Sequence, residues 1–171
     1  FWGTVVENGI FPSPVRQAQR MLRINRSFDE YIHRFEESFM TKNFQTLTEA
    51  FHNVTVEFDL NPPEFVYDKL VGMWNKNTFL CKPFPETLEV LEELKKDYKL
   101  ALISNTDNLS VPQLLDKFDL KKYFDEISLS CDVGMLKTDK KMFADLLKKL
   151  KLKKSEVVMV GDSIPTDIKG A

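Results

Sequence analysis

The chain has 171 residues, of which 24 are Lys or Arg and 26 are Asp or Glu, so its formal net charge is −2 at pH 7. This near balance argues against nucleic acid as the main partner, because nucleic-acid-binding proteins normally carry an excess of basic residues. Hydrophobic residues make up 43% and charged residues 29% of the chain, which is typical of a globular protein with a sizeable core. No run of about 18 apolar residues is present, so the sequence predicts no segment that crosses a membrane.

The two cysteines, Cys81 and Cys131, are too few for a disulfide framework and lack the neighbouring ligands of a zinc site. They favour buried thiols in a reducing compartment, and we therefore expect a cytoplasmic protein.

The residue patterns at the two ends of the chain suggest that the sequence begins inside a strand and ends inside a helix. Residues 1–6 resemble the end of a buried strand that enters a Gly-Thr turn, and residues 167–171 resemble the first turns of a helix. We therefore expect the sequence to be part of a longer chain.

Residues 12–77 have a helical pattern, with apolar residues at helical spacing in four short segments. The second segment begins at Ser27, which is followed three residues later by Glu30 in the pattern of a capping box. The fourth begins after Pro62-Pro63, as expected for proline at the start of a helix. Short connections between four helices predict a small bundle.

From residue 82 onward, helices alternate with short apolar runs. Three of these runs predict buried strands, at residues 99–103, 126–130 and 156–160, and helices are predicted near 85–94, 111–118 and 142–150. Alternation of this kind indicates an α/β fold with a parallel sheet. We assign residues 1–11 and 82–171 to this α/β core and residues 12–81 to an inserted helical domain.

Polar side chains follow each predicted strand. Ser104 and Asn105 follow the run at 99–103, Lys137 lies beyond the second run, and Asp162 and Asp167 follow the third. The carboxyl ends of parallel strands meet at one edge of the sheet, so we expect these groups to converge there.

The residue types at this edge suit phosphate chemistry. Asp162 and Asp167 offer the oxygen ligands that Mg²⁺ prefers, and Mg²⁺ usually keeps several waters. The Ser104 hydroxyl could hold phosphate oxygens, and Lys137 would supply a compact positive charge. Each residue alone also fits an ordinary structural role, such as a helix cap or a solvated lysine. Their order and common location favour a phosphoryl-transfer site that lacks its nucleophile.

These segments resemble the motifs of the haloacid dehalogenase (HAD) superfamily. The resemblance covers the whole chain in order, and its four segments are Phe1-Trp2-Gly3-Thr4, Leu102-Ile103-Ser104-Asn105, Gly134-Met135-Leu136-Lys137 and Gly161-Asp162-Ser163 through Asp167. The first resembles the tail of Asp-x-Asp-Gly-Thr, and the last is the most specific. The resemblance implies a Rossmann-like core with a parallel sheet and a helical C1 cap inserted after the first motif.

The resemblance also implies a mechanism and a set of roles. An aspartate would attack phosphorus and form an aspartyl-phosphate, which water would then hydrolyse. Mg²⁺ would be held by Asp162 and by the backbone carbonyl of Trp2. Phosphate would be held by Thr4, Ser104, Asn105 and Lys137, and Lys137 and Asp167 would be the catalytic pair. The expected substrate is a small phosphorylated metabolite, and the expected assembly is a monomer or homodimer.

Two departures from the superfamily pattern matter. The nucleophile would lie immediately before Phe1, so the chain as given lacks it, and we expect the last strand of the core to lie outside the given sequence as well. Trp2 stands where the phosphatases carry a general acid, and its side chain has no titratable proton to give a leaving group.

Two other functions fit the same sequence. Haloacid dehalogenases also lack that second aspartate, so a 2-haloacid dehalogenase-like hydrolase is one alternative, although the presence of Asp162 favours magnesium and phosphate. A catalytically weak protein that uses this fold to bind a ligand or another protein is the other.

Overall fold

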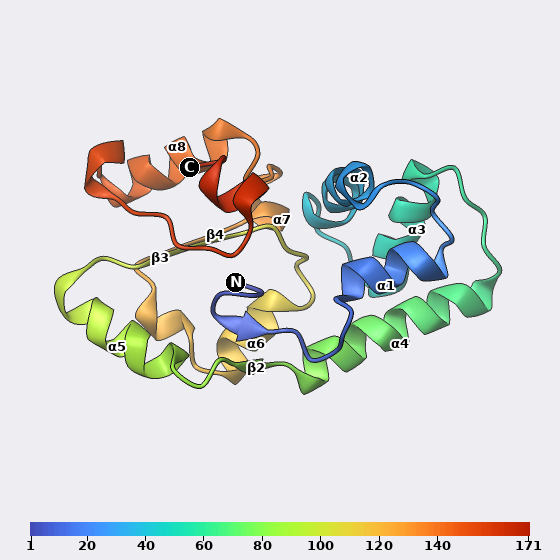
Figure 1. Ribbon diagram of the computed structural model, residues 1–171, viewed down its shortest axis with the longest axis horizontal. Coiled ribbons are helices and arrows are strands. Elements are labelled where there is room, and N and C mark those ends of the chain that lie inside the picture. Colours follow the sequence, from blue (N-terminus) through green and yellow to red (C-terminus); the bar gives the residue numbers. More distant parts are fainter.

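The computed structural model describes residues 1–171 and divides into a helical region and an α/β region (Figure 1). The helical region holds the four helices α1 (Pro14–Met21), α2 (Phe28–Met40), α3 (Leu47–Glu57) and α4 (Glu64–Leu80). All four were expected from the apolar spacing, and Figure 1 shows them gathered at one end of the molecule.

The helical region is held together by aromatic side chains. The ring centroid of Phe39 lies 4.9 Å from that of Phe51 and 4.7 Å from that of Trp74, and Phe35 stacks on Phe39 at 5.0 Å. Phe35, Phe39 and Phe51 are completely buried. Aromatic pairs at these separations contribute about 0.5–1.5 kcal/mol each beyond the burial of their area. The predicted capping box at the start of α2 is present, since Ser27 and Glu30 each accept a hydrogen bond from the other's backbone N–H.

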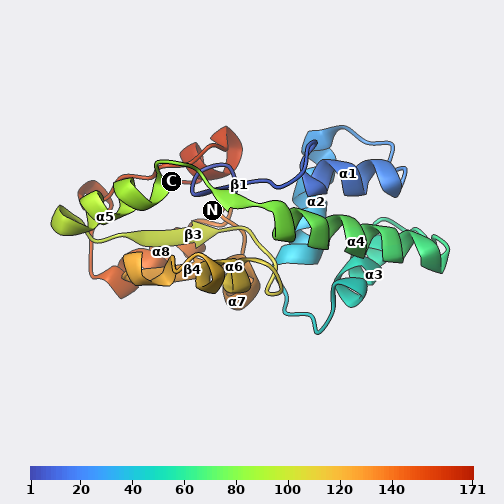
Figure 2. The same cartoon turned by 90° about the horizontal axis from the view of Figure 1, so that it is seen from below.

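The α/β region contains a two-stranded parallel sheet, as its alternating pattern predicts. The strands β3 (Ala101–Ser104) and β4 (Glu126–Leu129) run side by side (Figure 2). Ser104 lies opposite Leu129 at their carboxyl ends. The helices around them are α5 (Thr87–Asp97), α6 (Val111–Lys117), α7 (Ser130–Val133) and α8 (Lys140–Leu150).

Alternate residues of β3 serve two separate cores. Leu102 packs in the cluster that contains Val111, Leu114 and Leu115 of α6, whereas Ile103 packs with Met142 and Leu146 of α8. The sheet is therefore covered on both faces, as a parallel sheet requires. Ser104 is the last residue of β3, and Asn105 follows it at the carboxyl end of the strand.

The expected third strand at residues 156–160 is absent, and this prediction is wrong. A short 3₁₀ helix covers Lys154–Glu156, and no strand pairs with the residues that follow. Val158 and Val160 are 89% and 75% exposed. A strand needs a neighbour for its backbone N–H and C=O groups, and the apolar run in the sequence could not show that none would be supplied.

The two ends of the chain also differ from their predicted elements. Phe1 is buried, but its carbonyl accepts hydrogen bonds from Thr4, Val5 and Val6 in a tight turn rather than a sheet. At the other end a five-residue π-helix (Ile164–Ile168) forms.

Two chain segments connect the regions and lie against each other. Strand β1 (Val6–Glu7) pairs antiparallel with β2 (Lys82–Pro83), so the chain enters and leaves the helical region through one two-stranded ribbon. No helix is long and apolar enough to cross a membrane. Both cysteines are buried free thiols, as their sparse pattern suggested.

Candidate active site

The structure brings Lys137 and Asp167 together in a buried ion pair. The Lys137 ammonium contacts Asp167 Oδ1, and the two side chains are only 10% and 3% exposed. The second oxygen of Asp167 accepts the backbone N–H of Ser163 at 3.0 Å. A Cβ atom on Gly161 would lie 2.2 Å from this carboxylate, so glycine is required there for the carboxylate to fit. A pair 30 residues apart in sequence is therefore fixed at the end of the sheet.

The segment after β3 lies against this pair. Asn105 accepts the backbone N–H of Lys137 on its side-chain oxygen at 2.8 Å, which ties the end of β3 to the Lys137 loop. The buried Ser104 hydroxyl has only a long contact, 3.4 Å, to the Asn105 carbonyl. No hydrogen bond joins Ser104 to Lys137 or to Asp162. The Ser104 hydroxyl is therefore free to turn toward a ligand, whereas the Asn105 amide is largely engaged within the protein.

Asp162 makes no hydrogen bond or ion pair with Lys137 or Asp167 and lies against the turn at the beginning of the chain. Its carboxylate accepts the Thr4 hydroxyl at 3.1 Å. A Cβ atom on Gly3, whose φ is +77°, would lie 2.3 Å from the same carboxylate. Close approach and positive φ thus both require glycine at this position. Thr4 contacts Asp162 rather than the residues predicted to share a phosphate with it.

The backbone nitrogen of Phe1 lies near both groups of residues. Phe1 is buried, and the charges of Lys137, Asp167 and Asp162 all act on this nitrogen. A residue attached to it would enter the same cluster of charges.

Glu36 is a site residue that the sequence patterns did not reveal. It projects from α2 and accepts a hydrogen bond from the Asn105 side-chain amide at 2.8 Å. Loss of water contact raises the pKa of its carboxyl group, and the Asn105 hydrogen bond and the charge of Lys137 oppose that rise. The only signal in the sequence was an acidic residue directly beside the buried Phe35, which did not distinguish it from Glu37 on the solvated face.

Further contacts hold the helical region on the α/β region. Asn108 both donates to and accepts from the backbone of Phe44, at 2.9 and 3.0 Å. The Trp74 indole donates to the Ser110 hydroxyl at 3.0 Å, and Ser130 donates to the Met40 carbonyl. These bonds fix α2 and α4 over the loop that follows β3.

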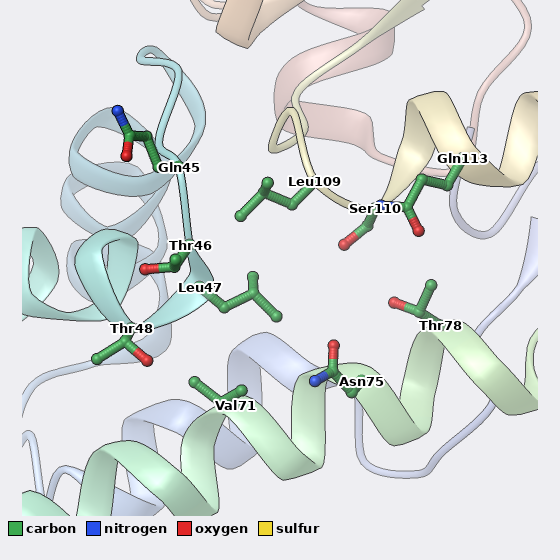
Figure 3. A pocket seen from close by; sticks show the side chains of 10 residues that line it. All are labelled: Gln45, Thr46, Leu47, Thr48, Val71, Asn75, Thr78, Leu109, Ser110 and Gln113. Atoms are coloured by element: carbon green, nitrogen blue, oxygen red, sulfur yellow. The ribbon is translucent and has the colours of Figure 1, made fainter.

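A cavity of about 260 Å³ lies at the same junction, between α3, α4 and the start of α6 (Figure 3). Most of its lining side chains are neutral and polar, among them Gln45, Asn75 and Gln113. None of the predicted site residues lines it, so we place the candidate active site at the Lys137–Asp167 pair and not in this cavity.

The chain's own oxygen atoms fit a magnesium ion that keeps most of its waters. Asp162 is exposed, and the carbonyl of Trp2, in the turn whose Gly3 lies against the Asp162 carboxylate, accepts no hydrogen bond within the chain. No group of three or more His, Cys, Asp or Glu side chains lies close enough to form a complete metal cage. One carboxylate and one carbonyl suit Mg²⁺, which commonly takes only one or two protein carboxylates.

Known proteins resemble this chain in sequence. A family model described as haloacid dehalogenase-like hydrolase matches residues 21–171. Glyceraldehyde 3-phosphate phosphatase of Methanocaldococcus jannaschii is 32% identical over 133 residues, which are 76% of this chain and 55% of that protein. The protein of the same name from Methanothermobacter thermautotrophicus is 33% identical over 103 residues, or 60% of this chain and 46% of that protein. The chain thus spans about half the length of these relatives.

Solved structures share the fold. A HAD phosphatase from Thermococcus onnurineus superposes with a TM-score of 0.58 and 24% identity, covering 98% of this chain and 77% of the other. The HAD-hydrolase YfnB from Bacillus subtilis, solved with magnesium bound, superposes with a TM-score of 0.55 and 17% identity, covering 98% of this chain and 79% of that one. The family model matches most of the chain, and the solved structures share its fold. The chain therefore belongs to the haloacid dehalogenase-like hydrolase family.

Proposed function

We propose that the full-length protein is a magnesium-dependent phosphatase of a small phosphorylated metabolite, with an aspartate directly before Phe1 as its nucleophile. The observation that carries this proposal is the buried ion pair of Lys137 and Asp167, whose charges both act on the buried nitrogen of Phe1. A carboxylate on the preceding residue would have the cation of Lys137 close by to balance an incoming phosphate dianion. It would attack phosphorus and form the aspartyl-phosphate that water then hydrolyses.

The residues of the site would have separate roles in binding phosphate and in binding Mg²⁺. Lys137, held by Asp167, would neutralise the phosphate oxygens, and the Ser104 hydroxyl and a free Asn105 amide hydrogen would donate to them. Thr4 would hold the Asp162 carboxylate in place and contact phosphate from the other side. Asp162 and the Trp2 carbonyl would hold Mg²⁺, which when bound would polarise the phosphoryl oxygens.

The names of the relatives and the position of the helical region both support the substrate class. The curated relatives at 32–33% identity are named for glyceraldehyde 3-phosphate, a small phosphomonoester. The helical region lies over the end of β3 through the Asn105–Glu36 and Asn108–Phe44 contacts, which suits a cap that admits small substrates. We therefore assign residues 12–81 to the cap domain and residues 1–11 and 82–171 to the catalytic core.

The test is phosphate release by the full-length protein from a panel of small phosphomonoesters, in Mg²⁺ and in chelator. We expect release in Mg²⁺ and its loss in chelator. Asp162→Asn should abolish the Mg²⁺-dependent release, whereas Asp97→Asn, at an exposed position at the end of α5, should leave it unchanged. Full activity of Asp162→Asn would contradict the metal assignment. Release of halide from a 2-haloacid, with no phosphate release, would favour a dehalogenase instead.

A further inference from the structure

One acidic side chain of the helical region reaches the candidate active site. Glu36 lies on α2, and its Oε2 accepts the Asn105 amide at 2.8 Å, while Asn105 in turn holds the backbone of Lys137. The charged groups that act on it are Lys137 and Asp167 from the α/β region and His33 from the preceding turn of α2. Its other oxygen, Oε1, makes no hydrogen bond within the chain. Glu36 is therefore held at one oxygen and free at the other.

Hydrolysis of an alkyl phosphate needs a proton donor, because an alkoxide is a poor leaving group until it is protonated. Trp2, in the turn beside the site, has no titratable proton. Asp167 is committed to its ion pair with Lys137 and to the Ser163 N–H. Asp162 is exposed, accepts the Thr4 hydroxyl and is the proposed metal ligand. Glu36 is the remaining carboxyl group that contacts a site residue.

The surroundings of Glu36 favour its protonated form. Its pKa is raised chiefly by loss of water contact, and the negative charge of Asp167 acts in the same direction. The Asn105 hydrogen bond, Lys137 and His33 oppose this rise without cancelling it. A carboxyl group in this state holds a proton at a pH where an exposed glutamate has lost it.

We propose that Glu36 is the general acid that protonates the leaving-group oxygen, supplied by the cap instead of by the Trp2 position. This inference rests on the proposed phosphatase function. As the carboxylate nucleophile bonds to phosphorus, the bond between phosphorus and the ester oxygen breaks, and the Glu36 proton passes to that oxygen to release a neutral alcohol. The resulting Glu36 carboxylate is reprotonated from solvent, and water hydrolyses the aspartyl-phosphate to the free carboxylate and dihydrogen phosphate.

The experiment compares Glu36→Gln with Glu37→Gln in the full-length protein. Glu37 is the neighbouring residue of α2, and its side chain is 67% exposed and pairs with His33 rather than with a residue of the site, so it is a matched control. Each variant is assayed on an alkyl phosphate and on p-nitrophenyl phosphate, whose leaving group needs little protonation. We expect Glu36→Gln to lower kcat on the alkyl phosphate by about 10²–10⁴-fold, the usual contribution of a general acid. It should change kcat on p-nitrophenyl phosphate by less than about tenfold, and Glu37→Gln should change neither.

The pH profile provides a second readout. The acid must be protonated to act, so kcat on the alkyl phosphate should fall in the wild type as pH rises through the pKa of Glu36. That alkaline limb should be missing in Glu36→Gln. The released alcohol and the released phosphate are both measured, so that the rate reported is the rate of complete hydrolysis.

Three results would overturn the role. An equal loss on both substrates would mean that Glu36 only positions Asn105, and no loss on either would mean that it does not contribute to turnover. If the variant does not fold, the wild type is tested alone on aryl phosphates of graded leaving-group acidity, where a steep dependence of rate on acidity would overturn the proposal and a shallow one would support it. Absence of phosphate release by the wild type would instead contradict the phosphatase function itself.

Discussion

The helical region and the α/β region follow their sequence patterns to different degrees. In the helical region every predicted helix forms and its aromatic residues are buried together, with Phe39 in contact with Phe35, Phe51 and Trp74. In the α/β region the strands β3 and β4 pair as predicted, but the apolar run at 156–160 is largely exposed and unpaired. A helix satisfies its backbone hydrogen bonds within its own segment, whereas a strand depends on a neighbour. The same local pattern therefore predicts a helix more securely than it predicts a strand.

The largest expected effect on stability is in the aromatic core of the helical region. Phe39→Ala should lower the free energy of unfolding by about 3–5 kcal/mol, because it removes a fully buried ring and leaves a cavity among three other aromatic side chains. Urea unfolding, followed by circular dichroism, measures this change. Phe11→Ala is the matched control, since Phe11 is 96% exposed and its loss should cost less than about 0.5 kcal/mol. Equal effects of the two changes would mean that the aromatic cluster does not hold the helical region together.

An intermediate effect is expected where the two regions meet. Asn108→Ala should lower the free energy of unfolding by about 1–3 kcal/mol, because the Phe44 backbone N–H and C=O both lose their partner. Asn43→Ala, in the loop that carries Phe44, is the control, since Asn43 is exposed and its side chain makes no hydrogen bond. Hydrogen exchange of the Phe44 amide gives the second measurement and should speed up only in Asn108→Ala. If that amide exchanges at the wild-type rate, the contact between the two regions does not depend on Asn108.

Much of the candidate site could be predicted from local sequence, but Glu36 could not. The Lys137 and Asp167 side chains were expected at the carboxyl edge of the sheet, and they form an ion pair there. The short spacing between Asp162 and Asp167 was visible in the sequence, but their separation into two environments depends on the turn around Gly3. Glu36 escaped local patterns because its contact with Asn105 joins residues 69 positions apart, in different regions of the molecule.

The prediction of a third strand at residues 156–160 was wrong for the same physical reason. Its apolar residues were visible, but whether they are buried depends on what lies beside them, and that is a property of the whole fold. The helices of the helical region needed no such information, because the capping box at Ser27 and the spacing of the aromatic residues lie within a few residues of one another.

The smallest expected effect gives the sharpest test of the contrast between the two regions. Val158 lies in the apolar run that was predicted to be a buried strand, yet 89% of its surface is exposed. Val158→Ala should therefore change the free energy of unfolding of this 171-residue chain by no more than about 0.5 kcal/mol, as expected for an exposed side chain. Val54→Ala in α3 provides the comparison, because Val54 is fully buried and the same change should cost several times more. A cost for Val158→Ala as large as that for Val54→Ala would show that Val158 is covered, and the failure of the strand prediction would then have to be explained by something other than the lack of a neighbour.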